Sequence, residues 1–332
     1  MKKAFAAVPK ETFTKFFDAP RAEKLNSLID LTLPDEFKKD ADWLSQQIHA
    51  ADAEIVLTGW GSPPITEKTL DENPQLKYMC HLSGTVRAYI TRDIIEKGLL
   101  VTNWGSAIGP TVAEASLLGI LSCLRNTNEV TFLMHENLGW NSDKNVRSLF
   151  YRKVGLHGFG IIAQCLAELL QPFKCDISTY SPHAPDSALE KYNVRRVDSL
   201  KDLYAQNTVI SVHASNTPDN HHIVNAEILA AMPDNAVLVN TARSAVIDSN
   251  ALLAELKSGR ISASLDVFDN EPLPANSPLR GLRNCQLTPH TGGPTPDRLV
   301  DMGDVAIANL ENFINGRKVE NILTPERYDL IT

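Results

Sequence analysis

Short apolar runs alternate along the chain with stretches in which apolar residues recur every three or four positions. The runs predict buried strands and the recurring pattern predicts helices, so the alternation is typical of parallel sheets covered by helices. A first series has apolar runs at 54–60, 76–82 and 99–104, with helical patterns at 37–49 and 90–97. A second series has apolar runs at 154–158, 175–181, 208–214, 236–242, 262–268 and 285–290. We therefore predict an α/β protein with one compact unit followed by one larger sheet.

Two helical patterns connect the series. A long apolar helix is predicted from Thr111 to Arg125, and an amphipathic helix over 297–315 returns the chain to the first unit. We therefore predict one domain of residues 1–103 and 295–332, and a second domain of residues 104–294 inserted into it.

Composition and charge narrow the class of protein. The chain has 332 residues, 43% of them hydrophobic, and a net charge of -8, which disfavours a nucleic-acid partner because phosphate binding requires clustered Lys and Arg. The basic N-terminus carries too short an apolar segment for a signal peptide, and no run approaches about 18 apolar residues. Five cysteines occur singly and predict neither a disulfide framework nor a metal site: Cys80, Cys123, Cys165, Cys175 and Cys285. We expect a cytoplasmic protein without a membrane partner.

The stretch Lys153–Ala163, KVGLHGFGIIA, predicts a nucleotide-binding turn. After a strand, Gly158 permits a tight turn and Gly160 permits close approach of a pyrophosphate to the helix that begins at Ile161 and Ile162. Ala163 takes the third position of the G-x-G-x-x-G/A pattern, where close packing of helix on strand is needed. Glycine-rich turns also serve as simple connections, and the strand–turn–helix context favours a dinucleotide.

The choice between NAD and NADP stays open in the sequence. The acidic residue expected about 20 positions after the turn is replaced by Ser181, which does not repel a 2′-phosphate. His183 is the nearest positive candidate, and Arg195 and Arg196 lie further along the chain. We favour NAD slightly, because an NADP site needs a positive partner for the phosphate.

Several separated segments then resemble the D-isomer-specific 2-hydroxyacid dehydrogenase family along nearly the whole chain. They occur in the family's order, at 111–121, 154–167, 239–248, 264–274 and 287–293. The resemblance implies two Rossmann-like domains with parallel sheets, the nucleotide domain being inserted into the substrate domain. It also implies a nicotinamide cofactor, a small 2-oxo or 2-hydroxy acid substrate and a homodimer.

The resemblance also assigns roles to residues. His290 would exchange a proton with the substrate, Glu271 would pair with the imidazole, and Arg243 would bind the substrate's carboxylate and carbonyl oxygens. The loop of Gly84, Thr85 and Val86 would bind the carboxylate through backbone N–H groups. Asp266 would contact the nicotinamide carboxamide, and further cofactor contacts are expected from Thr217, Thr241, Ala242, Gly292 and Gly293.

Each of these residues has a structural alternative. Taken alone, His290 is a surface histidine, Arg243 an ion-pair partner and Glu271 a solvated turn residue; only their joint occurrence favours catalysis. His221 and His222 are expected to be an exposed pair without a metal. Trp60 is expected either to line the substrate site or to pack in the fold.

Besides Ser181, four positions depart from the family pattern. Ser244 stands where glycine is common, Ser215 where proline is typical, and Arg87 and Tyr89 replace acidic and polar residues of the substrate loop. None removes a catalytic group, but Arg87 and Tyr89 put the identity of the substrate in doubt.

The sequence thus predicts an NAD(P)-dependent 2-oxo acid reductase, with glyoxylate, hydroxypyruvate and pyruvate-like acids as first candidates. A formate dehydrogenase is disfavoured because Glu271 stands where that enzyme has glutamine. A 3-phosphoglycerate dehydrogenase with a regulatory tail is disfavoured by the short segment after the returning helix. Two alternatives stay open: a phosphite-oxidising relative, which would keep the same three side chains, and a corepressor-like scaffold that senses NAD.

Overall fold

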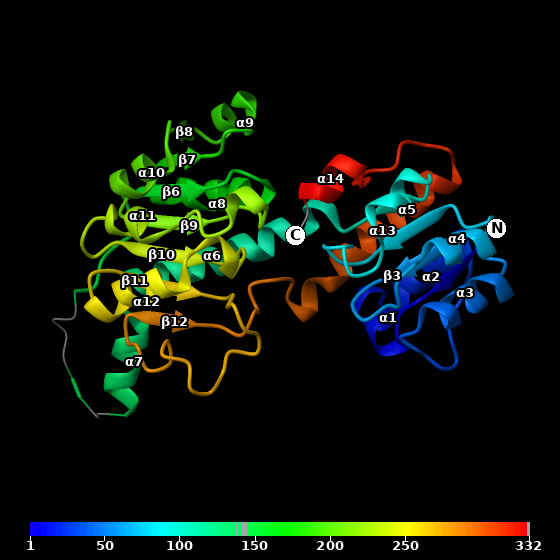
Figure 1. Cartoon of the computed structure of the whole chain (residues 1–332), viewed down its shortest axis with the longest axis horizontal. Coiled ribbons are helices and arrows are strands. Elements are labelled where there is room, and N and C mark those ends of the chain that lie inside the picture. Colours follow the sequence, from blue (N-terminus) through cyan, green and yellow to red (C-terminus); the bar gives the residue numbers. More distant parts are fainter. Residues whose placement is uncertain (137–138, 141–144, 331–332) are drawn as a thin grey trace. The chain divides into compact units, whose positions relative to one another are not determined.

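The computed structural model describes residues 1–136, 139–140 and 145–330 (Figure 1). Within it the chain divides into two compact units, residues 1–108 with 295–332, and residues 109–294. Each unit is built on one parallel sheet, as the alternating pattern predicts. Unit 2 is inserted into the sequence of unit 1, because the chain enters unit 2 once and leaves it once.

Unit 1 contains five parallel strands in the order β2-β1-β3-β4-β5. The strands are β1 Lys2–Ala6, β2 Ile29–Thr32, β3 Ile55–Thr58, β4 Tyr78–His81 and β5 Leu100–Thr102. The helices are α1 Lys10–Phe16, α2 Ala19–Leu28, α3 Ala41–Ala50, α4 Glu67–Glu72, α5 Arg92–Glu96, α13 Leu299–Ile314 and α14 Pro325–Leu330, with 3-10 turns η1 Gly105–Ile108 and η5 Pro296–Arg298. One apolar cluster joins α1, α2 and α13 to the sheet, and a second joins α3 and α5 to it, so both faces are covered.

The N-terminal strand β1 was not recognised in the sequence, although it lies inside the sheet of unit 1 between β2 and β3. The strand begins with two lysines, so it lacks the continuous apolar run that predicts a buried strand. Lys2 reaches Glu54 with Nζ 2.6 Å from Oε2, and Lys3 reaches Asp52 at 3.1 Å, while the residues from Ala4 onward are buried. The two lysines therefore extend to acidic side chains at the start of a central strand.

Unit 2 contains seven parallel strands in the order β12-β11-β10-β9-β6-β7-β8, which can be followed as a ladder in Figure 1. The strands are β6 Lys153–His157, β7 Asp176–Tyr180, β8 Arg195–Arg196, β9 Val209–Val212, β10 Val237–Asn240, β11 Ser262–Leu265 and β12 Cys285–Leu287. The helices are α6 Gly109–Leu124, α7 Thr127–His135, α8 Ile161–Leu170, α9 Asp186–Lys191, α10 Leu200–Gln206, α11 Ala226–Ala230 and α12 Ser249–Ser258, with 3-10 turns η2 Gln171–Phe173, η3 Pro218–Asn220 and η4 Ser244–Val246. The strand order reverses between β6 and β9, and parallel α/β sheets bind ligands at such a switch point.

Helix α6 packs closely on the sheet of unit 2. A Cβ on Gly119 would lie 2.8 Å from Oγ of Ser264, so only glycine allows this approach. Among the described residues, the helical segment Gly105–Leu124 is long and apolar enough to cross a membrane, but 61% of its 18-residue apolar stretch is buried inside the protein. Core helices have the same length and composition, so the segment is weak evidence for a membrane.

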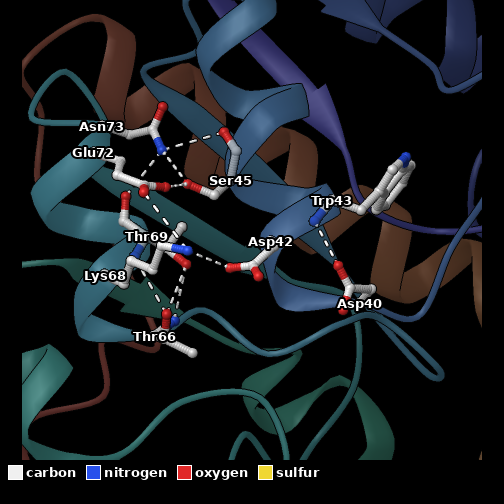
Figure 2. Close-up of polar contacts among 9 residues, drawn as sticks. All are labelled: Asp40, Asp42, Trp43, Ser45, Thr66, Lys68, Thr69, Glu72 and Asn73. Atoms are coloured by element: carbon white, nitrogen blue, oxygen red, sulfur yellow. Dashed lines mark hydrogen bonds and ion pairs between the residues drawn. The ribbon is translucent and has the colours of Figure 1, made fainter.

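A polar network joins α3 to α4 on one side of unit 1 (Figure 2). The fully buried amide of Asn73 donates to Oγ of Ser45 at 2.9 Å and to the carbonyl of Thr69 at 3.0 Å. Ser45 in turn donates to Glu72 at 2.6 Å, and the exposed Lys68 bonds Asp42 at 2.7 Å. The network fixes the two helices to each other.

Candidate active site

The glycine turn lies at the switch point of the unit 2 sheet. Gly158 follows β6 directly, with a φ of 89° that disfavours every other residue type. A Cβ there would also lie 3.0 Å from the backbone of His213 and Ala214, which follow the neighbouring strand β9. Gly158 is therefore required by the fold itself.

Gly160 has a different reason to be glycine. It caps α8 with an ordinary φ of -75°, and a Cβ there would meet nothing within 4 Å. The space in front of the helix is open, and the first turn of α8 contains no acidic residue. Free N–H groups and the positive end of the helix dipole bind phosphate at such a terminus.

The residues around α8 fit a dinucleotide. Ala163 is fully buried against the sheet, as close packing at the third position of the motif requires. Ile161 is 42% exposed at the start of the helix and Ile162 is partly buried. Gly160, Ile161 and Ile162 would hold the pyrophosphate, and the nicotinamide would supply hydride chemistry.

Ser181 directly follows β7, at the place where the ribose hydroxyls are expected. Its carbonyl accepts a hydrogen bond from Nη1 of Arg196 at 2.5 Å. The other end of that guanidinium binds the carbonyl of Ala184 at 2.6 Å and the carboxylate of Asp186 at 2.8 Å. The sequence placed Arg196 far along the chain, whereas pairing of β7 with β8 brings it beside Ser181.

Three more of the expected cofactor residues lie in loops that follow strands of unit 2. Thr217 precedes η3 and is partly buried. Thr241 and Ala242 follow β10, and the Thr241 hydroxyl lies 2.8 Å from the hydroxyl of Ser116 on α6. Contact of these residues with a cofactor stays a prediction.

The three candidate catalytic residues come from the carboxyl ends of adjacent strands. Arg243 follows β10, Glu271 lies in the loop after β11, and His290 lies in the loop after β12. These strands are neighbours in the sheet, so the topology brings together residues that are far apart in the sequence.

Glu271 and His290 form a direct pair. Oε2 of Glu271 lies 2.6 Å from Nδ1 of His290, and Oε1 accepts from the N–H of Phe268 at 2.9 Å. Burial raises the pKa of Glu271, but the hydrogen bonds from His290 and Phe268 and the charges of His290 and Arg243 outweigh it, so the pKa lies below its ordinary value. Glu271 is therefore ionised, and its bond to Nδ1 fixes the orientation of the imidazole.

Arg243 is held by its own turn. Its carbonyl accepts from the side chain of Asn240 at 3.0 Å, and Nη1 donates to the carbonyl of Ala242 at 2.7 Å. Burial lowers the pKa of Arg243, and the nearby charge of Glu271 acts in the opposite direction. An arginine stays charged in either case, so the site contains a half-buried fixed cation.

Asp266 has a role that the sequence did not reveal. It is 3% exposed, and its Oδ1 accepts from the hydroxyl of Thr288 at 2.6 Å and from the N–H of Thr291 at 2.8 Å. Its Oδ2 accepts from the N–H of Gly292 at 2.8 Å. The carboxylate thus holds the loop on both sides of His290, which itself has a φ of 53°. Its expected contact with the nicotinamide stays a prediction.

Gly292 and Gly293 differ in their surroundings. A Cβ on Gly292 would lie 2.8 Å from Oδ2 of Asp266, so the bond to that carboxylate requires glycine there. Gly293 has nothing within 4 Å of such a position, which leaves it open to a ligand.

The expected substrate loop follows β4 in unit 1. Gly84 packs against Trp104, whose ring would lie 2.8 Å from a Cβ, and its carbonyl accepts from Asn103 at 2.8 Å. Within the described part of the chain, the N–H groups of Gly84, Thr85 and Val86 have no hydrogen-bond acceptor. A turn with unused donors can bind a carboxylate.

His81, at the end of β4, bonds the residue just before this loop. The sequence did not indicate this role. His81 is buried, with Nδ1 2.8 Å from the hydroxyl of Thr58 and Nε2 2.6 Å from that of Ser83. Burial lowers the pKa of His81 to about 3, so the ring is neutral. A histidine at the end of a buried strand and three residues before a glycine was the available signal.

Trp60 and the paired histidines show packing contacts. Trp60 is 44% exposed, and its ring centroid lies 5.7 Å from those of both Phe16 and Trp104. His221 and His222 stack on each other with centroids 4.0 Å apart. No group of three potential metal ligands occurs among residues 1–136, 139–140 and 145–330.

Comparison with known proteins identifies the family. The family model of the D-isomer specific 2-hydroxyacid dehydrogenase NAD binding domain matches residues 117–292. The hydroxypyruvate reductase of Blautia hydrogenotrophica is 30% identical over 279 residues, which are 81% of this chain and 84% of that protein. The chain therefore belongs to the D-isomer specific 2-hydroxyacid dehydrogenases. It is an NAD(P)-dependent oxidoreductase acting on the CH–OH group of 2-hydroxy acids.

Other relatives extend the comparison. The D-3-phosphoglycerate dehydrogenase of Methanocaldococcus jannaschii is 30% identical over 84% of this chain but only 53% of that protein, so the chain spans about half of its length. A solved glyoxylate reductase from Paecilomyes thermophila, with 21% identity, has a TM-score of 0.81 and covers 98% of this chain and 99% of that chain. The predicted family and two-domain fold are thereby confirmed.

Proposed function

We propose that the protein reduces a small 2-oxo acid to the 2-hydroxy acid with NADH, using His290 as the proton donor. The observation that carries the proposal is the 2.6 Å bond between the ionised Glu271 carboxylate and Nδ1 of His290. This bond orients the imidazole, so that Nε2 can exchange a proton with the substrate.

The other residues have separate tasks. Arg243 binds the substrate's carboxylate and polarises the carbonyl that accepts the hydride. The unused N–H groups of residues 84–86 offer donors for a carboxylate. Asp266 keeps the His290 loop in place through Thr291 and Gly292. After hydride transfer, the proton moves from Nε2 of His290 to the carbonyl oxygen.

The choice of acid and cofactor is part of the proposal. The names hydroxypyruvate reductase and glyoxylate/hydroxypyruvate reductase among the relatives support glyoxylate and hydroxypyruvate as substrates. NAD is favoured because Arg196, which the pairing of β7 with β8 brings beside Ser181, is already bonded to Asp186 and to two carbonyls. A 2′-phosphate would have to displace these bonds.

We further propose a cytoplasmic homodimer. Unit 2 exposes several large apolar side chains: Leu118 on α6, Met134 on α7, and Val146, Phe150 and Tyr151 in the segment before β6. Large apolar patches on soluble proteins mark contacts with partners. Sedimentation of the purified chain tests this: a species of about twice the chain mass supports a dimer, and a monomer at micromolar concentration contradicts it.

The reaction is tested by following absorbance of the reduced nicotinamide with NADH and NADPH in parallel against a panel of 2-oxo acids. We expect consumption of NADH with glyoxylate or hydroxypyruvate, and slower oxidation of the 2-hydroxy acids under matched conditions. Faster oxidation than reduction contradicts the proposed direction. Faster use of NADPH contradicts the proposed cofactor. If neither cofactor is consumed although NADH binds, phosphite with NAD is tested next, and failure there favours the scaffold.

A further inference from the structure

The C-terminal helix α14 contacts the segment that continues from the substrate loop. Nη2 of Arg87, the residue after the loop, donates to the carbonyls of Tyr328 and Asp329 at 3.2 and 2.8 Å. The guanidinium also lies 5.6 Å from the centroid of the Tyr328 ring. Carbonyls in the last turn of a helix have no partner within the helix, and a cation there also interacts favourably with the helix dipole.

Two more bonds join the same elements. The hydroxyl of Tyr328 donates to the carbonyl of Ile90 at 3.0 Å. Nε of Arg92, on α5, lies 3.4 Å from Oδ2 of Asp329. Helix α14 therefore holds residues 87–92 at three points.

The helix is itself anchored to the body of unit 1. Leu323, just before it, is buried in the apolar cluster of α3 and α5, and its N–H donates to the carbonyl of Val101 in β5 at 2.9 Å. Thr324 accepts the N–H of Tyr328 at 2.9 Å and so begins the helix. A bond from Arg87 to α14 is thus a bond to a fixed support.

Arg87 is also coupled closely to the carboxylate-binding turn. The N–H groups of Tyr89 and Ile90 both donate to the carbonyl of Val86, at 2.8 and 3.0 Å. Residues 86–90 therefore form one turn. Helix α14 is bonded to Arg87 and Ile90 of this turn, and the unused donors of residues 84–86 lie at its start. Movement at Arg87 would be transmitted to those donors.

We propose that α14 fixes the geometry of the carboxylate-binding loop through Arg87, which acts as a positioning residue that lowers the KM for the acid. Arg87 points to the helix, so its departure from the family pattern is explained by this support and not by contact with the acid. The proposal rests on the proposed function for its kinetic part, whereas holding of the loop is measurable without turnover.

The test compares Arg87→Ala and Arg87→Lys with the control Arg21→Ala. Arg21 is another arginine of unit 1, and its guanidinium is bonded to Asp18 and Asp304. For Arg87→Ala we expect the KM for the 2-oxo acid to rise roughly tenfold, with kcat changed less than about twofold and the Kd for NADH unchanged. In Arg87→Lys we expect a smaller rise of the KM than in Arg87→Ala, because one donor can still reach the carbonyls. Arg21→Ala behaves as wild type.

Amide hydrogen exchange over residues 83–91 provides the second readout. Faster exchange there in Arg87→Ala, but not in Arg21→Ala, supports the proposal. Wild-type KM together with wild-type exchange in Arg87→Ala overturns it, as does an equal effect of Arg21→Ala. If the wild type reduces no 2-oxo acid, the proposed function fails, and the exchange comparison alone decides whether α14 holds the loop.

Discussion

The carboxylate of Glu271 and the imidazole of His290 lie 2.6 Å apart, although the two residues are 19 positions apart in the chain. Adjacent parallel strands β11 and β12 create this proximity, because each ends in a loop at the same edge of the sheet. In the proposed mechanism the carboxylate orients the ring, and the opposite ring nitrogen exchanges a proton with the substrate.

Replacing Glu271 by Gln should lower kcat for reduction by roughly one to two orders of magnitude, because the amide keeps a polar contact but lacks the negative charge. Steady-state kinetics with saturating NADH measures the effect. Asp269→Asn removes a nearby exposed charge and is the control. Equal rates for Glu271→Gln and wild type would show that the pair has no part in proton transfer.

Gly160→Ala and Gly158→Ala should separate cofactor binding from folding. A Cβ at position 160 meets no protein atom and projects in front of α8, so we expect weaker NADH binding, by roughly tenfold, with unchanged stability. A Cβ at position 158 lies 3.0 Å from backbone atoms at a φ of 89°, so stability should fall as well. NADH titration and thermal unfolding give the two readouts, and normal NADH affinity in Gly160→Ala argues against a phosphate site.

A buried histidine should make unit 2 sensitive to acid. Burial lowers the pKa of His157 to about 4, whereas the unfolded side chain protonates near 6.5. Between these pH values the unfolded chain binds more protons than the native chain, so the free energy of unfolding falls as pH falls. The loss should reach at most about 1.4 kcal/mol per pH unit for this residue.

Urea unfolding at pH 7, 6 and 5 checks this expectation. The variant His157→Phe should show a shallower fall of stability with pH than wild type. His49→Gln, which changes an exposed histidine at the end of α3, serves as the control. A slope that His157→Phe does not change would contradict the expected contribution.

The α3–α4 network of Figure 2 makes a prediction about stability alone. Asn73→Ala should lower the free energy of unfolding by about 2 kcal/mol, because buried acceptors of Ser45 and Thr69 lose their donor. Lys68→Ala, at an exposed ion pair of the same network, should cost less than about 1 kcal/mol. Denaturant unfolding compares the two, and equal losses would contradict the assigned burial effect.

Regular patterns made most of the fold predictable. The apolar run 54–60 became β3, and the run 154–158 became β6, because a buried parallel strand needs apolar side chains on both faces. Strand β1 escaped because Lys2 and Lys3 begin it, and β8 escaped because it has only two residues, Arg195–Arg196. Their pairing depends on partners distant in sequence.

The candidate site shows the same division. The resemblance to the family assigned proton transfer and carboxylate binding to positions 243, 271 and 290 before any geometry was known. The supporting bonds were not predicted. Asp266 holds the His290 loop and Arg196 bonds the turn at Ser181, and each bond joins residues that follow or lie on different strands. Such contacts follow from strand order, which no local pattern contains.

The most direct test of the central claim is reduction of glyoxylate or hydroxypyruvate by wild type and by His290→Gln, with NADH affinity measured on the same samples. The account predicts that the variant binds NADH as wild type does but loses activity by at least about two orders of magnitude. Turnover by His290→Gln at the wild-type rate would contradict the assignment of His290 as the proton donor.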